Sequence, residues 1–396
     1  MNSPDSSRLK QALSSPKSAG AAAFGAMLLA FLWVNSPYQS YYEVVHHAPM
    51  SVQIGSLVLA KPMISWINEG LMVFFFFLIG LEIKREVYEG QLSSVRQIAL
   101  PAVAALGGMA VPAAIYLAFN ADDPIAARGW AIPAATDIVL ALALLALLGS
   151  RVPTSLKIFL TALAIFDDLG TLVIIALFYS EKLSIFALML AGGGFSAALL
   201  LNRLRVTHIA PYVLVGGFLW ITLLQSGVHA TLAGVALALC IPVRTEGREM
   251  LKQIEHDLSP WVAFGVVPAF AFFNSGIEIS ASALQALAQP ISAGVALGLF
   301  LGKQLGIFIA VRSAVWLGLA NLPPGVNWWQ LYGVSLVAGV GFTMSLFITA
   351  LAFDEPGVIL TTNLSIVVGS LLSGVVGMLV LYFASRKQDP TANPST

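Results

Sequence analysis

Long apolar runs, separated by short polar segments, follow one another along almost the whole chain. A helix needs about 20 mostly apolar residues to cross the hydrocarbon core of a bilayer. By that measure we count twelve candidate spans, with ends fixed only to about 2–4 residues. They are 19–35, 62–84, 98–119, 126–148, 154–179, 183–202, 208–224, 227–242, 259–276, 291–318, 330–352 and 359–384. Glycine and proline interrupt several runs, so eleven to thirteen spans fit the same pattern. The pattern predicts an all-α polytopic membrane protein.

The segments between the predicted spans are short, so we expect one transmembrane domain over 1–396. The first apolar run begins near Gly20 and has no convincing cleavage site, so we expect it to be retained. Polar stretches at 1–18 and 385–396 are then tails, and 36–61 is the longest outer loop.

Residues 50–60 of that loop show the alternation of a β-hairpin. Val52 and Ile54, then Leu57 and Leu59, flank a Gly55–Ser56 turn. A hairpin here either caps the helix ends or pairs along its open edge with a second copy of the chain.

The basic residues orient the predicted helices. With the N-terminus inside, sixteen of the 20 lysines and arginines fall in inner segments. Three fall in outer segments: Lys61, Arg128 and Lys182. Since positive charge collects on the cytoplasmic side of membrane proteins, both termini are expected in the cytoplasm. The remaining basic residue, Lys303, lies within the tenth span.

Composition agrees with this picture. The chain is 58% hydrophobic and 10% charged, against about 25% charged residues in soluble proteins. A soluble enzyme, a nucleic-acid binder and a disordered scaffold are therefore excluded. The single cysteine, Cys240, excludes a disulfide framework and a cysteine-rich metal site, and reads as a small buried hydrophobe.

Three aspartates share the membrane core with Lys303: Asp137, Asp167 and Asp168. Each such charge costs about 2.5–3.5 kcal/mol at mid-membrane, so the four cost about 10–14 kcal/mol before pairing. A buried Asp–Lys pair that fixes helix register is one explanation. Three carboxylates for one lysine, however, leave an excess of negative groups, which suits a site that receives a positive ion. Glu69 and Glu82 lie nearer the ends of span two.

Asp167 and Asp168 are neighbours, and on a helix they point about 100° apart. One can face a water-filled cavity while the other faces an adjoining helix. Their titration belongs to the pair. Carboxylate oxygens suit hard cations such as Na⁺, so a proton and a small cation would compete for the same atoms.

Two spans carry helix-breaking residues at their centres. Pro133 lies four residues before Asp137, and Gly339 and Gly341 interrupt span eleven. A broken helix exposes positive partial charge at its new N-terminus and negative at its new C-terminus. We expect Asp137 to neutralise facing N-termini and Lys303 to neutralise facing C-termini. Thr136 is a candidate oxygen ligand, or a threonine bonded back to its own helix.

Six runs carry a family resemblance: F-L-I-G-L-E-I-K-R-E (77–86), G-W-A-I-P-A-A-T-D (129–137), L-A-I-F-D-D-L-G (163–170), S-G-V-H-A-T-L-A-G (226–234), G-K-Q-L-G (302–306) and G-V-G-F-T-M-S (339–345). In this order, and over nearly the whole chain, they resemble the bacterial NhaA-type sodium/proton antiporters. Those antiporters are themselves a standard example of the rule that paired broken spans mark an inverted repeat with a midplane site.

The resemblance implies twelve helices in two inverted repeats, with discontinuous helices 4 and 11 crossing at mid-membrane of the bacterial inner membrane. It implies electrogenic exchange of internal Na⁺ or Li⁺ for about two protons, silent at acid pH, with a role in pH homeostasis. Asp167 and Asp168 would bind the ions, Asp137 and Thr136 would support the crossing, and Lys303 would pair with Asp167. No cofactor and no organic substrate are expected, and the 50–60 hairpin would join two protomers in the lipid bilayer.

Two charged groups lie at predicted inner helix ends: Glu82, Arg85 and Glu86 in span two, and Lys252, Glu255 and His256 before span nine. Solvated charge at helix ends is the simpler interpretation, and the resemblance favours a pH sensor. His229 is either a packed core histidine or a modulator.

Rival functions fit the pattern less well. Intramembrane aspartyl proteases need two aspartates on different helices, whereas Asp167 and Asp168 are adjacent and no G-x-G-D run is present. A sodium-coupled symporter of an organic anion should carry a buried arginine, and no span core contains one. A passive channel would show no obligatory proton exchange.

Overall fold

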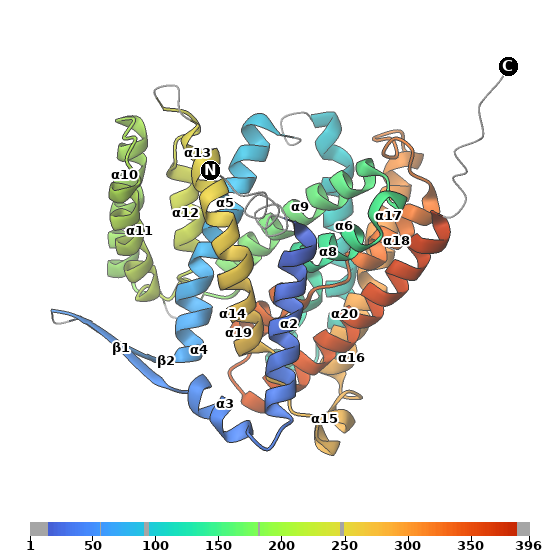
Figure 1. Cartoon of the computed structure of the whole chain (residues 1–396), viewed down its shortest axis with the longest axis horizontal. Coiled ribbons are helices and arrows are strands. Elements are labelled where there is room, and N and C mark those ends of the chain that lie inside the picture. Colours follow the sequence, from blue (N-terminus) through green and yellow to red (C-terminus); the bar gives the residue numbers. More distant parts are fainter. Residues whose placement is uncertain (1–14, 56, 91–94, 181–182, 246–248, 386–396) are drawn as a thin grey trace, which may run out of the picture. The chain divides into compact units, whose positions relative to one another are not determined.

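The computed structural model describes residues 15–55, 57–90, 95–180, 183–245 and 249–385 (Figure 1). All twelve predicted apolar runs contain helix. In this described part, eight helices are long and apolar enough to cross a membrane: Pro16–Val34, Met63–Glu89, Ile98–Asn120, Pro124–Leu147, Thr154–Phe178, Ile185–Arg203, Pro290–Trp316 and Pro356–Ala384. A ninth is the bent pair Trp328–Val337 and Phe342–Ala352. The all-α polytopic fold is confirmed.

Two predicted spans are shorter or less regular than their apolar runs, whereas α11 covers Ile209–Leu224 as predicted. α12 begins only at Leu232 and ends at Cys240. Gly227, where the predicted span begins, has a left-handed φ of 82° and therefore cannot belong to the helix. The ninth span is irregular because it is built from three consecutive helical segments. These are α13 (Met250–Trp261), a π-helical turn, η5 (Val262–Val266), and α14 (Val267–Asn274).

The helices pack as two compact units. One lies within Ala21–Ser93 and Leu169–Ile279. It holds α5 (Met72–Glu89), α10 (Ile185–Arg203) and α11 to α14. The other comprises Ser15–Gly20, Ser94–Asp168 and Ser280–Thr396. Of the predicted tails, only 15–18 and Ser385 are among the described residues, at the start of α2 (Pro16–Val34) and the end of α20 (Pro356–Ala384).

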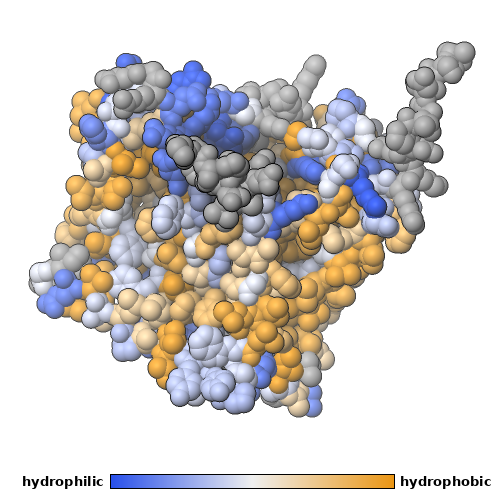
Figure 2. All heavy atoms as spheres, in the orientation of Figure 1, coloured by the Kyte–Doolittle hydropathy of each residue, from blue (hydrophilic) through white to orange (hydrophobic). Residues whose placement is uncertain are grey.

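The apolar surface identifies the surroundings of these helices. Side chains such as Leu177, Ile185 and Leu214 are 70–76% exposed, and Figure 2 shows apolar residues over much of one face. Exposed apolar surface on this scale is covered by another apolar phase. The protein is therefore embedded in lipid.

The predicted hairpin is confirmed. β1 (Pro49–Ile54) pairs antiparallel with β2 (Leu57–Pro62), with Val52 opposite Leu59. A short helix, α3 (Gln39–His46), precedes it in the segment expected to be a loop. Tyr42 anchors α3, because its side chain is buried and its hydroxyl donates to the Phe272 carbonyl over 2.8 Å.

The second unit has a close helix contact that positions Lys303. α6 (Val95–Asn120) and α17 (Lys303–Trp316) approach through Gly107 and Gly306. A Cβ atom added at Gly306 would lie 2.1 Å from the Gly107 carbonyl oxygen, so only glycine fits there. Around this contact, α8 (Ile138–Leu147), α9 (Thr154–Phe178), α17 and α18 (Trp328–Val337) share one buried apolar core.

Candidate functional site

Two helices of the second unit are broken where the sequence predicts. The first passes from a 3₁₀ turn, η3 (Arg128–Ala134), through extended residues Ala135 and Asp137 into α8. Pro133 favours this break, because its ring removes a backbone donor and clashes with the preceding helical turn. The second passes from α18 to α19 (Phe342–Ala352) with a bend of 44°.

The two breaks satisfy each other's backbone groups. The Asp137 N–H donates to the Val340 carbonyl over 2.7 Å. The Thr136 hydroxyl lies 2.9 Å from the Ala338 carbonyl oxygen, and Ser345 Oγ donates to the Ile132 carbonyl over 2.8 Å. Unwound backbone is tolerated at membrane depth only where protein or water satisfies it, and here each break does so for the other.

The Asp137 carboxylate, 1% exposed, lies between two helix N-termini. Its Oδ1 accepts from the Leu140 N–H at the start of α8 over 3.0 Å. Its Oδ2 accepts from both the N–H (3.0 Å) and the hydroxyl (2.6 Å) of Thr343 at the start of α19. A carboxylate at a helix N-terminus satisfies free donors and opposes the positive end of the helix dipole. One side chain therefore caps both half-helices.

Asp167 and Lys303 form a buried ion pair next to this crossing. Both are essentially inaccessible, at 1% and 0% exposed. Lys303 Nζ contacts Asp167 Oδ2, and Thr136 Oγ1 lies 2.6 Å from the same oxygen. The other carboxylate oxygen, Asp167 Oδ1, is buried and makes no hydrogen bond among the described residues. The pair thus presents one occupied oxygen and one oxygen able to take a further partner.

Asp168, 4% exposed, follows on α9 and acts electrostatically on Lys303. The Lys303 ammonium contacts Asp167, the pairing that the family resemblance implies. The further expectation that Lys303 neutralises helix C-termini stays a prediction.

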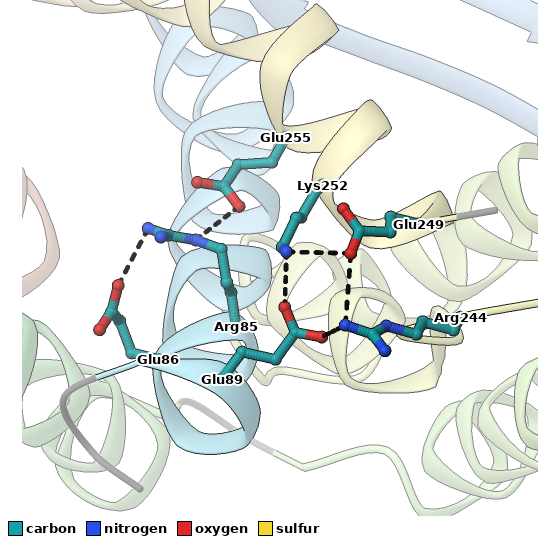
Figure 3. Close-up of polar contacts among 7 residues, drawn as sticks. All are labelled: Arg85, Glu86, Glu89, Arg244, Glu249, Lys252 and Glu255. Carbon is teal, nitrogen blue, oxygen red and sulfur yellow. Dashed lines mark hydrogen bonds and ion pairs between the residues drawn. The ribbon is translucent and has the colours of Figure 1, made fainter. Parts of the chain in front are cut away.

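A second ionic group lies in the first unit, at the end of α5 (Figure 3). Arg85 contacts Glu255 of α13 over 2.9 Å and Glu86 over 3.1 Å. The two charged groups that the sequence places far apart are therefore one cluster. Burial raises the pKa of Glu255, and the Arg85 charge partly opposes this.

Three further members of this cluster were missed by sequence reasoning. Glu89 contacts Lys252 over 2.7 Å and Arg244 over 2.8 Å, and both cations also contact Glu249. Glu89 lies one helical turn beyond Arg85, so the sequence spacing alone predicts that both residues share one face of α5. The positions of Arg244 and Glu249 in the cluster depend on the tertiary fold, which sequence spacing does not give.

The remaining predicted residues lie around these groups. Glu82 is partly buried on α5, where Glu255 and Arg85 act on it electrostatically. His256 lies on α13 and is exposed. His229 Nδ1 lies 2.7 Å from the Thr231 hydroxyl. Glu69 forms an ion pair with Lys61 at the end of the hairpin.

Among the described residues, no three histidine, cysteine or acidic side chains converge as metal ligands. The groups that gather at the two broken helices are the carboxylates of Asp137 and Asp167, the hydroxyl of Thr136 and the ammonium of Lys303. Broken helices around buried ionisable groups define a secondary ion transporter.

Comparison with known proteins gives the family. The family model described as "Na+/H+ antiporter 1" matches residues 10–381. The Na(+)/H(+) antiporter NhaA of Maricaulis maris is 60% identical over 97% of this chain and 96% of its own. That of Pseudomonas fluorescens is 50% identical, over 94% and 96%. The chain belongs to the Na⁺/H⁺ antiporter 1 family, whose members are secondary transporters and not enzymes.

We predict that Asp137→Ala destabilises the protein by about 1–4 kcal/mol, because two helix N-caps at about 0.5–2 kcal/mol each are lost. Thermal unfolding of the purified protein in detergent measures this. Asp354→Asn, at an exposed position, is the control. An Asp137→Ala variant that unfolds at the wild-type temperature would show that the carboxylate does not hold the two half-helices.

Proposed function

We propose that this chain exports Na⁺, and Li⁺, in exchange for about two protons, by alternating access across the bacterial inner membrane. The observation that supports this most directly is the buried carboxylate of Asp167, which is paired with Lys303 and adjacent to Asp168 at the junction of two broken helices. Such a site is costly to bury and serves a transported cation.

The geometry suggests how cation and proton compete. Lys303 and Thr136 occupy Asp167 Oδ2, while Oδ1 has no hydrogen-bond partner among the described residues. A dehydrated Na⁺ needs several oxygen ligands, and carboxylates with a hydroxyl supply hard oxygens. Na⁺ binding at Asp167 and Asp168 displaces protons from the same groups, and protons displace Na⁺ when the site opens to the other side. Asp137 and Thr136 support the crossing, and no cofactor or organic substrate is needed.

The proposed stoichiometry makes transport electrogenic. Two protons entering for each Na⁺ leaving moves one net positive charge inward. A membrane potential contributes about 2.3 kcal/mol per 100 mV to that charge. The exchange can therefore remove Na⁺ and acidify the cell interior at alkaline pH, which is a role in pH homeostasis.

We expect Asp167→Asn and Asp168→Asn each to abolish Na⁺-dependent proton flux in proteoliposomes, down to the level of liposomes without protein. Asparagine keeps the shape but holds neither the proton nor the negative charge. Asp354→Asn, which changes an exposed aspartate, should leave the flux unchanged. Near-normal flux in either site variant would refute the assignment of the pair.

We propose further that the cluster at the end of α5 regulates exchange with pH, through Glu82, Arg85, Glu86, Lys252 and Glu255. Since burial raises the pKa of Glu255, this carboxyl stays neutral to higher pH than an exposed glutamate. As pH rises through that value it ionises and its attraction to Arg85 strengthens. The tie between α5 and α13 is therefore strongest at alkaline pH.

Glu255→Gln should move the pH of half-maximal exchange to a more alkaline value, because glutamine permanently resembles the protonated form. Proton flux measured across a pH series tests this. Asp257→Asn, exposed on the same helix, is the matched control. A profile identical to wild type would remove Glu255 from the sensor, and His256→Ala in the same series decides whether the histidine belongs to it.

The hairpin supports a proposed homodimer. Both strands have an open edge in this two-stranded sheet, and Met50, Val52 and Val58 are 40–56% exposed. An open strand edge with apolar side chains is a template for pairing with another chain.

Replacing residues 50–61 by a short Gly-Ser turn should convert a dimer to a monomer in light scattering of the detergent-purified protein. Met50→Ser with Val58→Ser keeps the strand backbone and should weaken the dimer less. A dimer that survives removal of the hairpin would contradict this interface.

A further inference from the structure

An exposed arginine lies against an aromatic ring at one end of the second unit. The Arg312 guanidinium of α17 is 4.4 Å from the centroid of the Trp328 ring, at the start of α18. It forms no ion pair with any of the described residues. We propose that Arg312 and Trp328 form a binding site for the headgroup phosphate of an anionic phospholipid.

The position of Arg312 along its helix places it at the membrane boundary. The span Pro290–Trp316 ends one helical turn after Arg312, and Lys303 is its central residue. Arg312 follows Lys303 by nine residues, which corresponds to about 14 Å along an α-helix. Half the hydrocarbon thickness of a bilayer is about 15 Å. The Arg312 guanidinium therefore lies at the depth where lipid phosphates begin.

Arg312 belongs to the lipid-facing stripe of α17. Leu305, Ile309 and Trp316 are 41%, 56% and 83% exposed. Their spacings of seven, three and four residues from Arg312 place all four side chains on one helix face. Apolar side chains exposed on this face contact lipid chains, and a charged group at the end of such a stripe is costly without a polar partner. A lipid phosphate at the boundary supplies that partner.

Trp328 fixes the direction of the guanidinium. The Phe308 ring of α17 lies edge-on to both Trp328 (5.9 Å between centroids) and Tyr332 (5.5 Å). The Tyr332 hydroxyl in turn donates to Gln304 Oε1 of α17. A guanidinium stacked on a ring that is held in this way keeps the N–H donors at its edge free. Those donors match the oxygens of a phosphate in a bidentate geometry.

The start of α18 adds donors beside the same ring. The N–H groups of Trp328 and Trp329, in the first turn, donate to no group among the described residues. Asn327 Oδ1 instead accepts from the Gln330 N–H over 2.9 Å. Free N–H groups at a helix N-terminus attract phosphate, and the helix dipole adds positive partial charge there. Arg312 and the first turn of α18 thus attract an anion to one place.

The charge at this end of the unit favours an anionic headgroup. Side-chain hydrogen bonds join the start of α9 and the end of α20 to the segment that includes the α17–α18 connection. Residues 149–157, 312–331 and 382–385, which form this end, contain no acidic residue and three basic residues: Arg151, Lys157 and Arg312. A zwitterionic headgroup would bring its own cation toward these groups, whereas phosphatidylglycerol brings only the anion. The site therefore prefers phosphatidylglycerol to phosphatidylcholine.

The test is a titration of the full-length, detergent-purified protein with phosphatidylglycerol, with bound lipid counted by native mass spectrometry. We expect the dissociation constant of one bound lipid to rise about five-fold in Arg312→Gln, the size of one basic contact at a membrane surface. Arg312→Lys keeps the charge but loses the planar stack, so its affinity should fall between the two. Phosphatidylcholine should bind wild type and Arg312→Gln equally weakly.

Arg151→Gln is the matched control. Arg151 lies at the same end, and its guanidinium is 4.3 Å from the centroid of the Tyr382 ring. It shares the charge and the stacking but not the free N–H groups of α18. Its loss should weaken binding less than about two-fold, because the attraction between exposed charges is screened beyond about 10 Å. An equal loss in Arg151→Gln and Arg312→Gln would show diffuse surface attraction and overturn the site.

Thermal unfolding gives an independent measurement. A ligand that binds only the folded state raises the melting temperature, so phosphatidylglycerol should stabilise wild type more than Arg312→Gln. Equal binding and equal stabilisation in both proteins would overturn the proposal and leave Arg312 as an interfacial anchor. Inorganic phosphate that stabilises wild type as strongly as the lipid would show a site for a free anion instead. None of these measurements uses Na⁺ or proton flux, so failure of the lipid site and failure of the proposed exchange are separate results.

Discussion

The buried contact between Asp167 and Lys303 is the interaction on which the rest of the second unit depends. Removing two charges from water is costly, and their attraction in a low-dielectric interior repays this only with good geometry and further hydrogen bonds. Thr136 supplies one such bond at Asp167. Removing one partner of a buried pair leaves an uncompensated charge, which costs about 3–5 kcal/mol. In the exchange proposed above, a proton or Na⁺ would supply the missing positive charge whenever Lys303 moved away from Asp167.

The crossing of the broken helices answers a second constraint, that no backbone donor can remain free in lipid. Asp137 caps two half-helices at once, and its own N–H donates to the Val340 carbonyl of the other break. Moving either half-helix therefore disturbs groups that also contact Asp167. The scaffold and the ion site share atoms, so occupancy of the site and the position of the half-helices are physically coupled.

The charged residues at the end of α5 are more exposed to solvent than the buried pair of Asp167 and Lys303. In the cluster at the end of α5, the side chains of Arg244, Glu249 and Lys252 are 41–64% exposed, so solvent and salt screen the attraction within their ion pairs. Glu255 is only 17% exposed and contacts Arg85. Burial raises the pKa of Glu255 above that of an exposed glutamate, whereas the more exposed ion pairs join α5 to the chain before α13.

The sequence alone determined that the chain enters a membrane, where its helices break, and that three aspartates and a lysine are buried, because apolar run length, proline, glycine and charge act locally. It did not reveal α3, Glu89 with Arg244 and Glu249, or the Gln304–Tyr332 bond. Only the tertiary structure decided which carboxylate Lys303 meets and that the two charged groups are one cluster. Lys303 and Asp167 are separated by 136 residues. Periodicity shows which helix face is polar, but only the packing of helices brings two such faces together.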